Sequence, residues 1–446
     1  MLQLPTLPSS LSALLATLRP CFTAPSFRMF TALVAGLIVQ PGRRTITGML
    51  TGAGLARAVH HARAHWFFSG ARWSADQLGL AVAGLIGTRL LPAGGPLLVA
   101  VDDSLFRRSG RRVHGAAWCH DGAAPTRTGR AVAWGNCWVI AGLIVSLPFL
   151  DRPVCLPVLA RLHVPGKGKA VKPRKQAAPA STVSAAAALV TLLAGAFPGR
   201  AVHVTADAHY HGPALRDLPA TVTWTTRLPK NAVLCALAPP RVRKPGRPAR
   251  KGRRPGTWAE MAAAAAWTPA TVHIYGRDQA EDLAEVTCLW YGCLDTITVR
   301  VILARDADTT LALVTTDLAA LAAALVERYA GRWSIEQAFS DARTVPGAGE
   351  ARTRARRAVE RTVPFAMLVH TLVITWYARH GHDPAGIAAR RAAEPWYAGM
   401  REPAFEDMLT GLRRVLITAR ISGGSAAHPG PEQITAVLAA WHAAAA

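Results

Sequence analysis

The segment TTDLAALAAALVERYAGRWSIEQAFSDAR, from Thr315 to Arg343, is predicted to form one long helix. Thr316 or Asp317 can cap its free N–H groups at the start. Alanine and leucine, which have high helix propensity, follow without an intervening proline. The polar side chains of this predicted helix indicate which residues to look for in the rest of the chain.

Four polar side chains of this helix share one face. At about 100° per residue they fall within an arc of about 60°. They are Tyr329, Arg332, Glu336 and Arg343. One acid, two cations and a phenol on a single stripe suit a metal ion beside a phosphate. The alternative is a solvated helix face with ordinary i,i+4 pairings. Partner carboxylates elsewhere in the chain would favour the first interpretation.

The composition indicates a folded protein with a polyanionic partner. The 446 residues are enough for about two or three domains, and 51% of them are hydrophobic, which argues against a disordered chain. Lys and Arg number 51 against 27 Asp and Glu, a formal charge of +24. Nucleic acid is the simplest partner for such an excess of positive charge.

The seven cysteines are scattered, odd in number and without a CxxC pair. This pattern is neither a disulfide framework nor a zinc site, so a reducing cytoplasm fits best. The first residues show no basic segment before an apolar core, so no signal peptide is expected.

Two apolar segments raise the alternative of a membrane protein. Ala131 to Leu150 has the length of a membrane span. However, it contains Asn136 and Pro148 and is rich in Val and Ile, which favours a buried strand. Val363 to Tyr377 is short and contains a histidine, so a buried helix is predicted there.

The chain begins with helical patterns over residues 1–92 and changes to strand patterns after Pro96. In the helical part, Arg43 and Arg44 are candidate DNA phosphate contacts, although an ordinary basic surface explains them equally well. The strand PLLVAVDDSLF, residues 96–106, contains Asp102 and Asp103. With this strand as the first, the order is three strands, a helix, a strand, a short helix and a strand.

A second acid comes directly after the fourth of these strands. AVHVT, residues 201–205, leads into Ala206 and Asp207. The order of elements predicts a mostly parallel sheet that presents both acids at its strand ends.

Residues 227–314 interrupt this pattern with basic loops and alternating strands. Strands are predicted at Thr271–Tyr275, Ala284–Tyr291, Thr296–Leu303 and Leu311–Thr315. Arg227 and Lys230 begin this region and are candidate contacts to the DNA backbone. We expect the dense cationic run of residues 241–254 to follow DNA as a loop, and the basic linker of residues 165–175 to be a solvated loop. Beyond the long helix, residues 350–361 are predicted to start a charged helix.

Asp102 or Asp103, Asp207 and Glu336 together supply the acids that two-metal phosphoryl transfer requires. Hard Mg²⁺ or Mn²⁺ ions bind carboxylate oxygens and stabilise both the attacking and the leaving oxygen of a phosphodiester. The partner carboxylates are therefore present in the sequence.

These residues resemble the bacterial insertion-sequence transposases of the DDE superfamily that carry a Y-R-E-K signature. YAGRWSIEQAFSDAR has Tyr329, Arg332 and Glu336 at the spacing of that signature, with Arg343 in place of the lysine. VDDS resembles the first-aspartate strand, TADAHY the second-aspartate turn, and TTDL the start of the catalytic helix. RRTITGML, near Arg43, resembles a segment of the N-terminal domains. The resemblance extends over roughly residues 25–380.

The resemblance implies a ribonuclease-H-like α/β core, with a mixed sheet and flanking helices, interrupted by a β-strand insertion. It implies a triad of Asp102, Asp207 and Glu336 that binds two Mg²⁺ or Mn²⁺ ions, with Asp103 as the alternative first ligand. Tyr329, Arg332 and Arg343 would then hold phosphates of the transposon end. Candidates to stack on a flipped base are Trp258, Trp267 and Trp290.

The implied function is a DNA transposase that binds terminal inverted repeats and cleaves and transfers strands by cut-and-paste. The partners would be double-stranded DNA, both transposon ends and target, and a second copy in a synaptic homodimer in the bacterial cytoplasm at the nucleoid, without a membrane. The alternatives are a silent or domesticated DNA-binding relative, a related DNA endonuclease, or a basic membrane-associated protein. The implied regions are 1–92 (DNA-binding), 93–226 (first part of the core), 227–314 (insertion), 315–380 (catalytic helix and end of the core) and 381–446 (C-terminal helices).

Overall fold

The computed structural model describes residues 6–122, 132–165, 181–240, 248–306, 309–397, 399–423 and 435. Ten strands of these residues form one mixed sheet in the order β2-β3-β1-β5-β6-β10-β9-β8-β7, with β4 also paired to β3. The strands are β1 (Leu97–Arg107), β2 (Ala117–His120), β3 (Val132–Val145), β4 (Val154–His163), β5 (Val202–Ala206), β6 (Val222–Arg227), β7 (Thr268–Ile274), β8 (Arg277–Leu289), β9 (Thr298–Arg305) and β10 (Thr310–Thr315).

The prediction of a mostly parallel sheet is wrong. Only the β1–β5 and β5–β6 pairs are parallel, and the other pairs are antiparallel. The reason is connectivity. Strands joined by loops or hairpins run back alongside one another, while the parallel strand β5 follows a helical crossover. The resulting mixed α/β architecture is compatible with a ribonuclease-H-like core.

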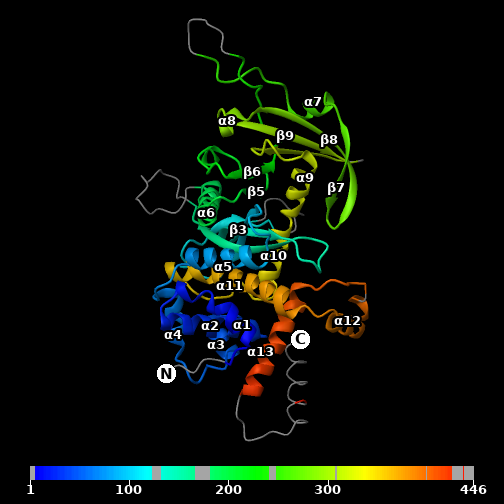
Figure 1. Ribbon diagram of the computed structural model, residues 1–446. Coiled ribbons are helices and arrows are strands. Elements are labelled where there is room, and N and C mark those ends of the chain that lie inside the picture. The colour runs from blue at the N-terminus through cyan, green and yellow to red at the C-terminus, as the bar shows by residue number, and fades with distance from the viewer. Residues whose placement is uncertain are drawn as a thin grey trace.

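Strands β7 to β10 continue the same sheet instead of forming a separate one. β10 pairs antiparallel with β6 over Leu313–Thr315 and with β9 along its whole length. Figure 1 shows β7, β8 and β9 extending the sheet away from the N-terminal helices of residues 9–89 and from the helices of residues 356–423. The four strand predictions for this region are confirmed, although β8 begins at Arg277, well before the predicted start at Ala284, and the other ends differ by a few residues.

The helices gather mainly at the other end of the molecule (Figure 1). They are α1 (Ser9–Ala16), α2 (Ala24–Val39), α3 (Ile46–Gly52), α4 (His61–Ser69), α5 (Ala75–Arg89), α6 (Thr182–Ala196), α7 (Trp258–Ala263), α8 (Tyr291–Leu294), α9 (Ala322–Gly331), α10 (Ser334–Thr344), α11 (Arg356–Trp376), α12 (Pro384–Ala393) and α13 (Phe405–Gly423). α5 and α11 pack against β4, α6 packs against β3 and β4, and α10 packs against β4 and β1.

Both apolar segments that suggested a membrane lie inside the fold. The first is strand β3, which is buried from Gly135 to Val145, and the prediction of a buried strand is confirmed. The second lies within α11, and the predicted buried helix is also confirmed. The helical segment Arg356–Gly381 is long and apolar enough to cross a membrane, but 94% of its most apolar window is buried inside the protein.

One buried arginine ties the N-terminal helices to α11. The guanidinium of Arg361 donates to the carbonyl oxygens of Phe67, Phe68, Ala71 and Trp73. Burial lowers the pKa of Arg361 to about 10. Its charge is solvated by these backbone dipoles in place of water, so it fixes α11 against the segment between α4 and α5.

The prediction of a single helix from Thr315 to Arg343 is wrong at both its start and its middle. Thr315 ends β10, and the helical conformation begins after Leu321. The side chain of Asp317 accepts from the N–H groups of Ala319 and Ala320 in a turn before the helix. The helix then divides into α9 and α10.

The division follows from short-range hydrogen bonds around Gly331. The N–H groups of Arg332, Trp333, Ile335 and Glu336 each donate to the carbonyl three residues earlier, which tightens the chain locally. Glycine weakens a helix at this point because it gains more backbone freedom on unfolding than other residues. α9 packs on β7, while α10 packs on β1 and β4.

Candidate active site

The parallel strands of the sheet bring three polar residues to one edge. Val101 of β1 pairs with Ala206 of β5, and Ala206 pairs with Thr226 of β6. The residues that follow these three positions are Asp102, Asp207 and Arg227. The site therefore lies where the parallel pairing ends, at the carboxyl edge of β5 and β6.

The first acid does not lie at a strand end, contrary to the prediction. β1 continues to Arg107, paired with β3, so Asp102 and Asp103 occupy the middle of a long strand. Successive side chains of a strand point to opposite faces, so the two acids have different surroundings. Asp103 accepts hydrogen bonds from the Tyr210 hydroxyl at 3.0 Å and the Cys137 thiol at 3.4 Å.

Asp102 faces α10 and the end of α9. The guanidinium of Arg332 donates to Asp102 Oδ2 at 2.9 Å and to Glu336 Oε1 at 3.0 Å. The side chains of Arg332 and Asp102 are only 12% and 15% exposed. The same arginine thus joins the strand carboxylate to the helix carboxylate.

Burial raises the pKa of Asp102 to about 7, and the nearby charge of Asp207 adds to this effect, while Arg332 opposes it. Burial acts to lower the pKa of Arg332, but the neighbouring Asp102, Tyr329 and Glu336 together outweigh it and the pKa is raised. Two carboxylates in a partly dry site repel each other, so cationic groups are favoured between them.

Asp207 is held by a tight turn after β5. Its Oδ1 accepts from the N–H of His209 at 2.8 Å, and its backbone carbonyl accepts from Tyr210 N–H and from the Thr226 hydroxyl. The turn fixes the backbone of Asp207 while its side chain stays half-buried. Its position beside Asp102 is therefore set by β5 pairing and by this turn together.

The structure places only some of the predicted DNA-contacting residues at the carboxylates. Those that lie there are Tyr329, Arg332 and Arg227. The pKa of Tyr329 is raised, mainly by burial. The positive charges of Arg332 and Arg227 act against this shift, and the negative charge of Asp207 adds to it. The Arg332 guanidinium carbon is 5.8 Å from the centre of the Tyr329 ring.

Arg343, on α10, contacts the same face of β1 as Arg332 does. Its contact is at Ser104, two residues beyond Asp102. Arg343 donates to the Ser104 hydroxyl at 2.6 Å, and its guanidinium lies 5.7 Å from the Phe106 ring centre. Its buried Nε has no hydrogen-bond partner among the described residues. Arg343 therefore flanks the carboxylates without contacting them directly.

The remaining predicted DNA contacts lie outside this cluster. Arg43 is exposed, and the backbone N–H of Arg44 donates to Glu350 Oε2 at 2.6 Å. Lys230 is exposed, and within the described part of the chain no ion pair joins it to an acid. Residues 241–247 and 166–175 of the two predicted basic loops lie outside the described residues.

The aromatic candidates for base stacking are engaged in packing. Trp290 is 6% exposed and stacks on His211 at 5.0 Å, and Trp267 lies under the Arg305 guanidinium at 4.2 Å. Trp258 is the half-buried first residue of α7. Trp118, on β2, is 68% exposed and was not among the aromatic residues singled out from the sequence.

The segment before α11 also differs from its prediction. The predicted helix start at Glu350 is wrong, since α11 begins at Arg356 and residues 351–354 form no helix or strand. The reason is that backbone groups of this segment pair elsewhere, as with the Arg354 carbonyl, which accepts from His114 N–H at 3.0 Å.

The residues of the site fit divalent metal ions by their chemistry. In the described residues no three His, Cys, Asp or Glu side chains are already close enough to hold an ion, because Arg332 stands between Asp102 and Glu336. The donors are carboxylate oxygens, which Mg²⁺ and Mn²⁺ prefer. Burial is the main cause of the raised pKa of Asp102, and a bound cation would favour the charged form of this carboxylate.

A mixed α/β core with acids from two adjacent strands and a helix is the arrangement that a nuclease-type site would require. The chain belongs to the DDE superfamily endonucleases: the model of that family matches residues 17–279. The matched segment contains Asp102 and Asp207 and ends before Glu336. No curated protein matches the chain. Membership implies a DNA-cleaving enzyme with DNA as substrate, of a superfamily whose nucleases generally use divalent metal ions.

Proposed function

We propose that this chain is the transposase of a bacterial insertion sequence, which binds terminal inverted repeats and cuts and transfers DNA strands by cut-and-paste. The observation that supports this proposal best is the convergence of Asp102 and Glu336 on Arg332, with Asp207 beside Asp102. Family membership supports DNA cleavage in general, and the Y-R-E-K spacing supports transposition.

Asp102, Asp207 and Glu336 would hold two Mg²⁺ or Mn²⁺ ions, with Asp102 preferred over Asp103 because Asp103 is occupied by Tyr210 and Cys137. Bound ions of this kind activate the attacking hydroxyl and stabilise the leaving oxygen of a phosphodiester. The protein orients the ligands through the β1–β5 pairing and the packing of α10 on β1.

The cations around the carboxylates would hold the phosphates of the DNA. Arg332, Arg343 and Arg227 present guanidinium groups, which form paired hydrogen bonds with phosphate oxygens. Tyr329 lies beside them with a neutral phenol, because burial raises its pKa. Lys230 would add an exposed positive charge at the entrance of the 227–314 region.

In this proposal the ribonuclease-H-like core consists of residues 93–226 and 315–380, with residues 227–314 as its insertion. Helices of residues 1–92 bind DNA through Arg43 and Arg44, and residues 381–446 complete the protein. Two copies cut two ends together as a synaptic homodimer, in the cytoplasm at the nucleoid and without a membrane. The net charge of +24 supports binding to DNA.

The test is cleavage of a labelled DNA that carries the ends of the element, with Mg²⁺ or Mn²⁺ present. Wild type is compared with Glu336→Gln and Asp207→Asn. Asp341→Asn is the matched control, since Asp341 lies on the same helix and contacts Gln337. We expect wild type and the control to cut at the ends, while the two triad variants bind DNA but do not cut it.

Three other outcomes are informative. Triad variants that cut as well as wild type would place the metal site elsewhere. Cutting without end specificity would favour a related DNA endonuclease. Binding without any cutting would favour a silent or domesticated relative.

A further inference from the structure

A second basic surface lies beyond Arg343, away from the carboxylates. The loop after β1, the segment before α3 and residues 349–354 line a common groove. Its charged lining residues are Arg43, Arg107, Arg108, Arg352, Arg354 and Glu350. Five arginines against one glutamate make it a strongly cationic groove.

Three of these arginines are available to a ligand. Arg43, Arg352 and Arg354 are exposed, and within the described residues no acid forms an ion pair with any of them. By contrast, Arg107 pairs with Asp121 at 2.6 Å. Glu350 accepts from the Arg44 backbone. Three exposed guanidinium groups at the groove therefore form no ion pair within the described residues.

The groove is held in shape by Arg108, a partly buried side chain. Its Nε donates to Asn136 Oδ1 at 2.8 Å, and its Nη1 donates to the carbonyls of Gly349 and Ala351 at 2.8 Å each. This arginine fixes the 349–351 backbone against β1 and β3. A ligand that binds there loses little free energy to ordering the segment.

Side chains alternate along the fixed segment. Ala351 and Thr353 are 4% and 8% exposed, while Arg352 and Arg354 are exposed. Buried small side chains anchor the segment and leave both guanidinium groups on its outer side. Two arginines so placed suit two phosphates of one DNA strand.

The groove adjoins a second hollow that reaches Arg343, the arginine that flanks the carboxylates. This hollow is lined by Arg343 and Phe106 and shares Arg107, Gly349 and Glu350 with the groove. Asp102, Ser104 and Phe106 lie on one face of β1, and Arg343 contacts the last two. From Asp102 to Arg107 the strand rises about 17 Å, at about 3.3 Å per residue.

We propose that this groove binds the sugar–phosphate backbone of the duplex that flanks the cleavage point, with Arg43, Arg352 and Arg354 as phosphate contacts. For a duplex that runs along β1, at about 3.4 Å per base pair, the contacts would lie about five base pairs or more from the scissile phosphate. This inference rests on the proposed function for the identity of the DNA and adds a surface that positions it.

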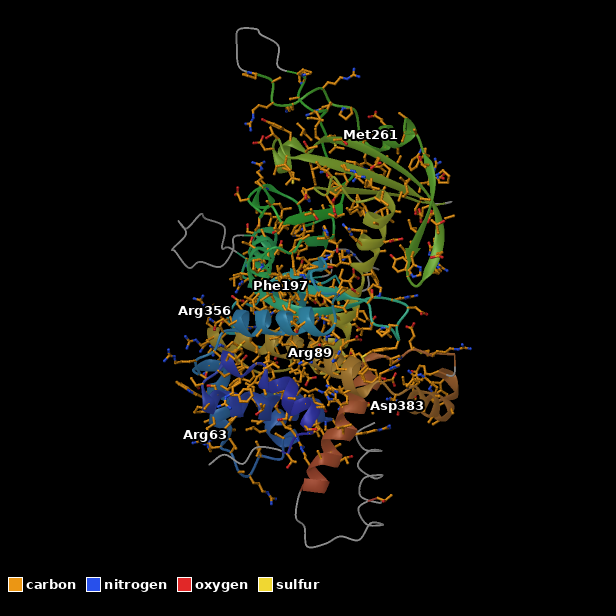
Figure 2. All side chains as sticks on the ribbon, viewed as in Figure 1. Arg63, Arg89, Phe197, Met261, Arg356 and Asp383 are labelled. Atoms are coloured by element: carbon orange, nitrogen blue, oxygen red, sulfur yellow. The ribbon has the colours of Figure 1, made fainter. Side chains whose placement is uncertain are left out.

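The test is binding of a duplex that carries the element's end, measured without divalent ions at several salt concentrations. The variant Arg352→Glu/Arg354→Glu is compared with wild type and with Arg89→Glu. Arg89 is an exposed residue at the end of α5, just before the opposite end of β1. Figure 2 shows it apart from Arg356, which follows the groove residue Arg354 by two positions.

We expect the groove variant to bind at least about tenfold more weakly and to lower the slope of log K against log salt by about 1.8, for two lost phosphate contacts. Arg89→Glu keeps the wild-type slope. Hydroxyl-radical footprinting is expected to show lost protection about five base pairs or more from the cut. Equal melting temperatures of the variants exclude misfolding as the cause.

An unchanged slope and footprint in the groove variant would overturn the inference. In another outcome, wild type binds the duplex without cutting it while the groove variant still loses the footprint. That result would support the groove as a DNA-binding surface and contradict the proposed catalytic function. If wild type does not bind the duplex at all, both proposals fail.

Discussion

Arg332 and Asp102 form a buried hydrogen-bonded ion pair at 2.9 Å, although 230 residues separate them in the chain. Arg332 also bonds Glu336 one turn along the chain. The pair fixes the junction of α9 and α10 over the middle of β1. The carboxylates of Asp102 and Glu336 are thereby held close to the same guanidinium group in the protein without DNA.

This bridge predicts that Arg332→Lys is not a conservative change. A lysine ammonium lacks the planar fork of guanidinium and cannot match both carboxylates in the same geometry. We expect cleavage to fall about tenfold or more, as two charge-assisted hydrogen bonds are worth about 1.5–3 kcal/mol each. Single-turnover cleavage measures the effect. Arg328→Lys, which alters the Arg328–Asp317 pair on α9, is the control that keeps its rate.

Asp102 and Asp103 are expected to respond differently to the same substitution. Asp102→Asn removes a proposed metal ligand and lowers cleavage at least about a hundredfold, which corresponds to several kcal/mol of lost transition-state stabilisation. Asp103→Asn keeps cleavage but lowers the free energy of unfolding by about 1–3 kcal/mol, because the Tyr210 and Cys137 donors then face an amide. Cleavage assays and denaturant titration of both variants separate the two effects. Loss of cleavage in Asp103→Asn alone would reverse the assignment.

Arg343 stands where the Y-R-E-K signature has lysine, so Arg343→Lys tests whether charge suffices. We expect cleavage within about tenfold of wild type, since a lysine keeps the positive charge near Ser104. Arg343→Ala is expected to weaken binding of the cut end by about 1.5–3 kcal/mol, the scale of a charge-assisted hydrogen bond. Equal binding of Arg343→Ala and wild type would remove Arg343 from the phosphate-binding set.

Divalent ions are expected to stabilise the folded protein without DNA. A ligand at about one hundred times its dissociation constant adds about 2.7 kcal/mol of stability. Mg²⁺ or Mn²⁺ should therefore raise the melting temperature of wild type, and EDTA should reverse the change. Glu336→Gln and Asp207→Asn should lose most of this shift. A shift of equal size in both variants would contradict the proposed ligand set.

Arg361 offers a test of the fold remote from the proposed chemistry. Arg361→Leu leaves carbonyls of Phe67, Phe68, Ala71 and Trp73 without their donor and should cost about 3 kcal/mol or more in the free energy of unfolding. Thermal or denaturant unfolding measures the loss. Arg357→Leu, an exposed position on the same helix, should stay within about 0.5 kcal/mol of wild type.

The sequence allowed the strands to be located because their apolar patterns are local. β3 and the strands of the 227–314 region are examples. It did not reveal that most neighbouring strands run antiparallel, since strand direction depends on partners far away in the chain. It also missed the break between α9 and α10. Helical periodicity continues through Gly331, and the three-residue hydrogen bonds that divide the helix leave no distinct pattern in the residues.

The residues of the candidate site could be predicted from the sequence, but their positions relative to one another could be predicted only in part. Spacing placed Tyr329, Arg332 and Glu336 on one face, and the structure brings them together near Asp102. Which of two adjacent aspartates faces Arg332 depends on strand register, which pattern analysis could not fix. The cationic groove was missed because Arg352 and Arg354 meet Arg43 only through tertiary folding.

The unbroken sheet has a mechanical consequence. β6 is hydrogen-bonded to β5, which leads into Asp207, and on its other edge to β10, through which β9, β8 and β7 are attached. The outer strands are thus connected to the aspartate that follows β5 by backbone hydrogen bonds between every pair of neighbouring strands, and within the described residues no flexible linker separates them in the sheet. A displacement of β7, β8 or β9 is therefore transmitted through the sheet to the strand that leads into Asp207.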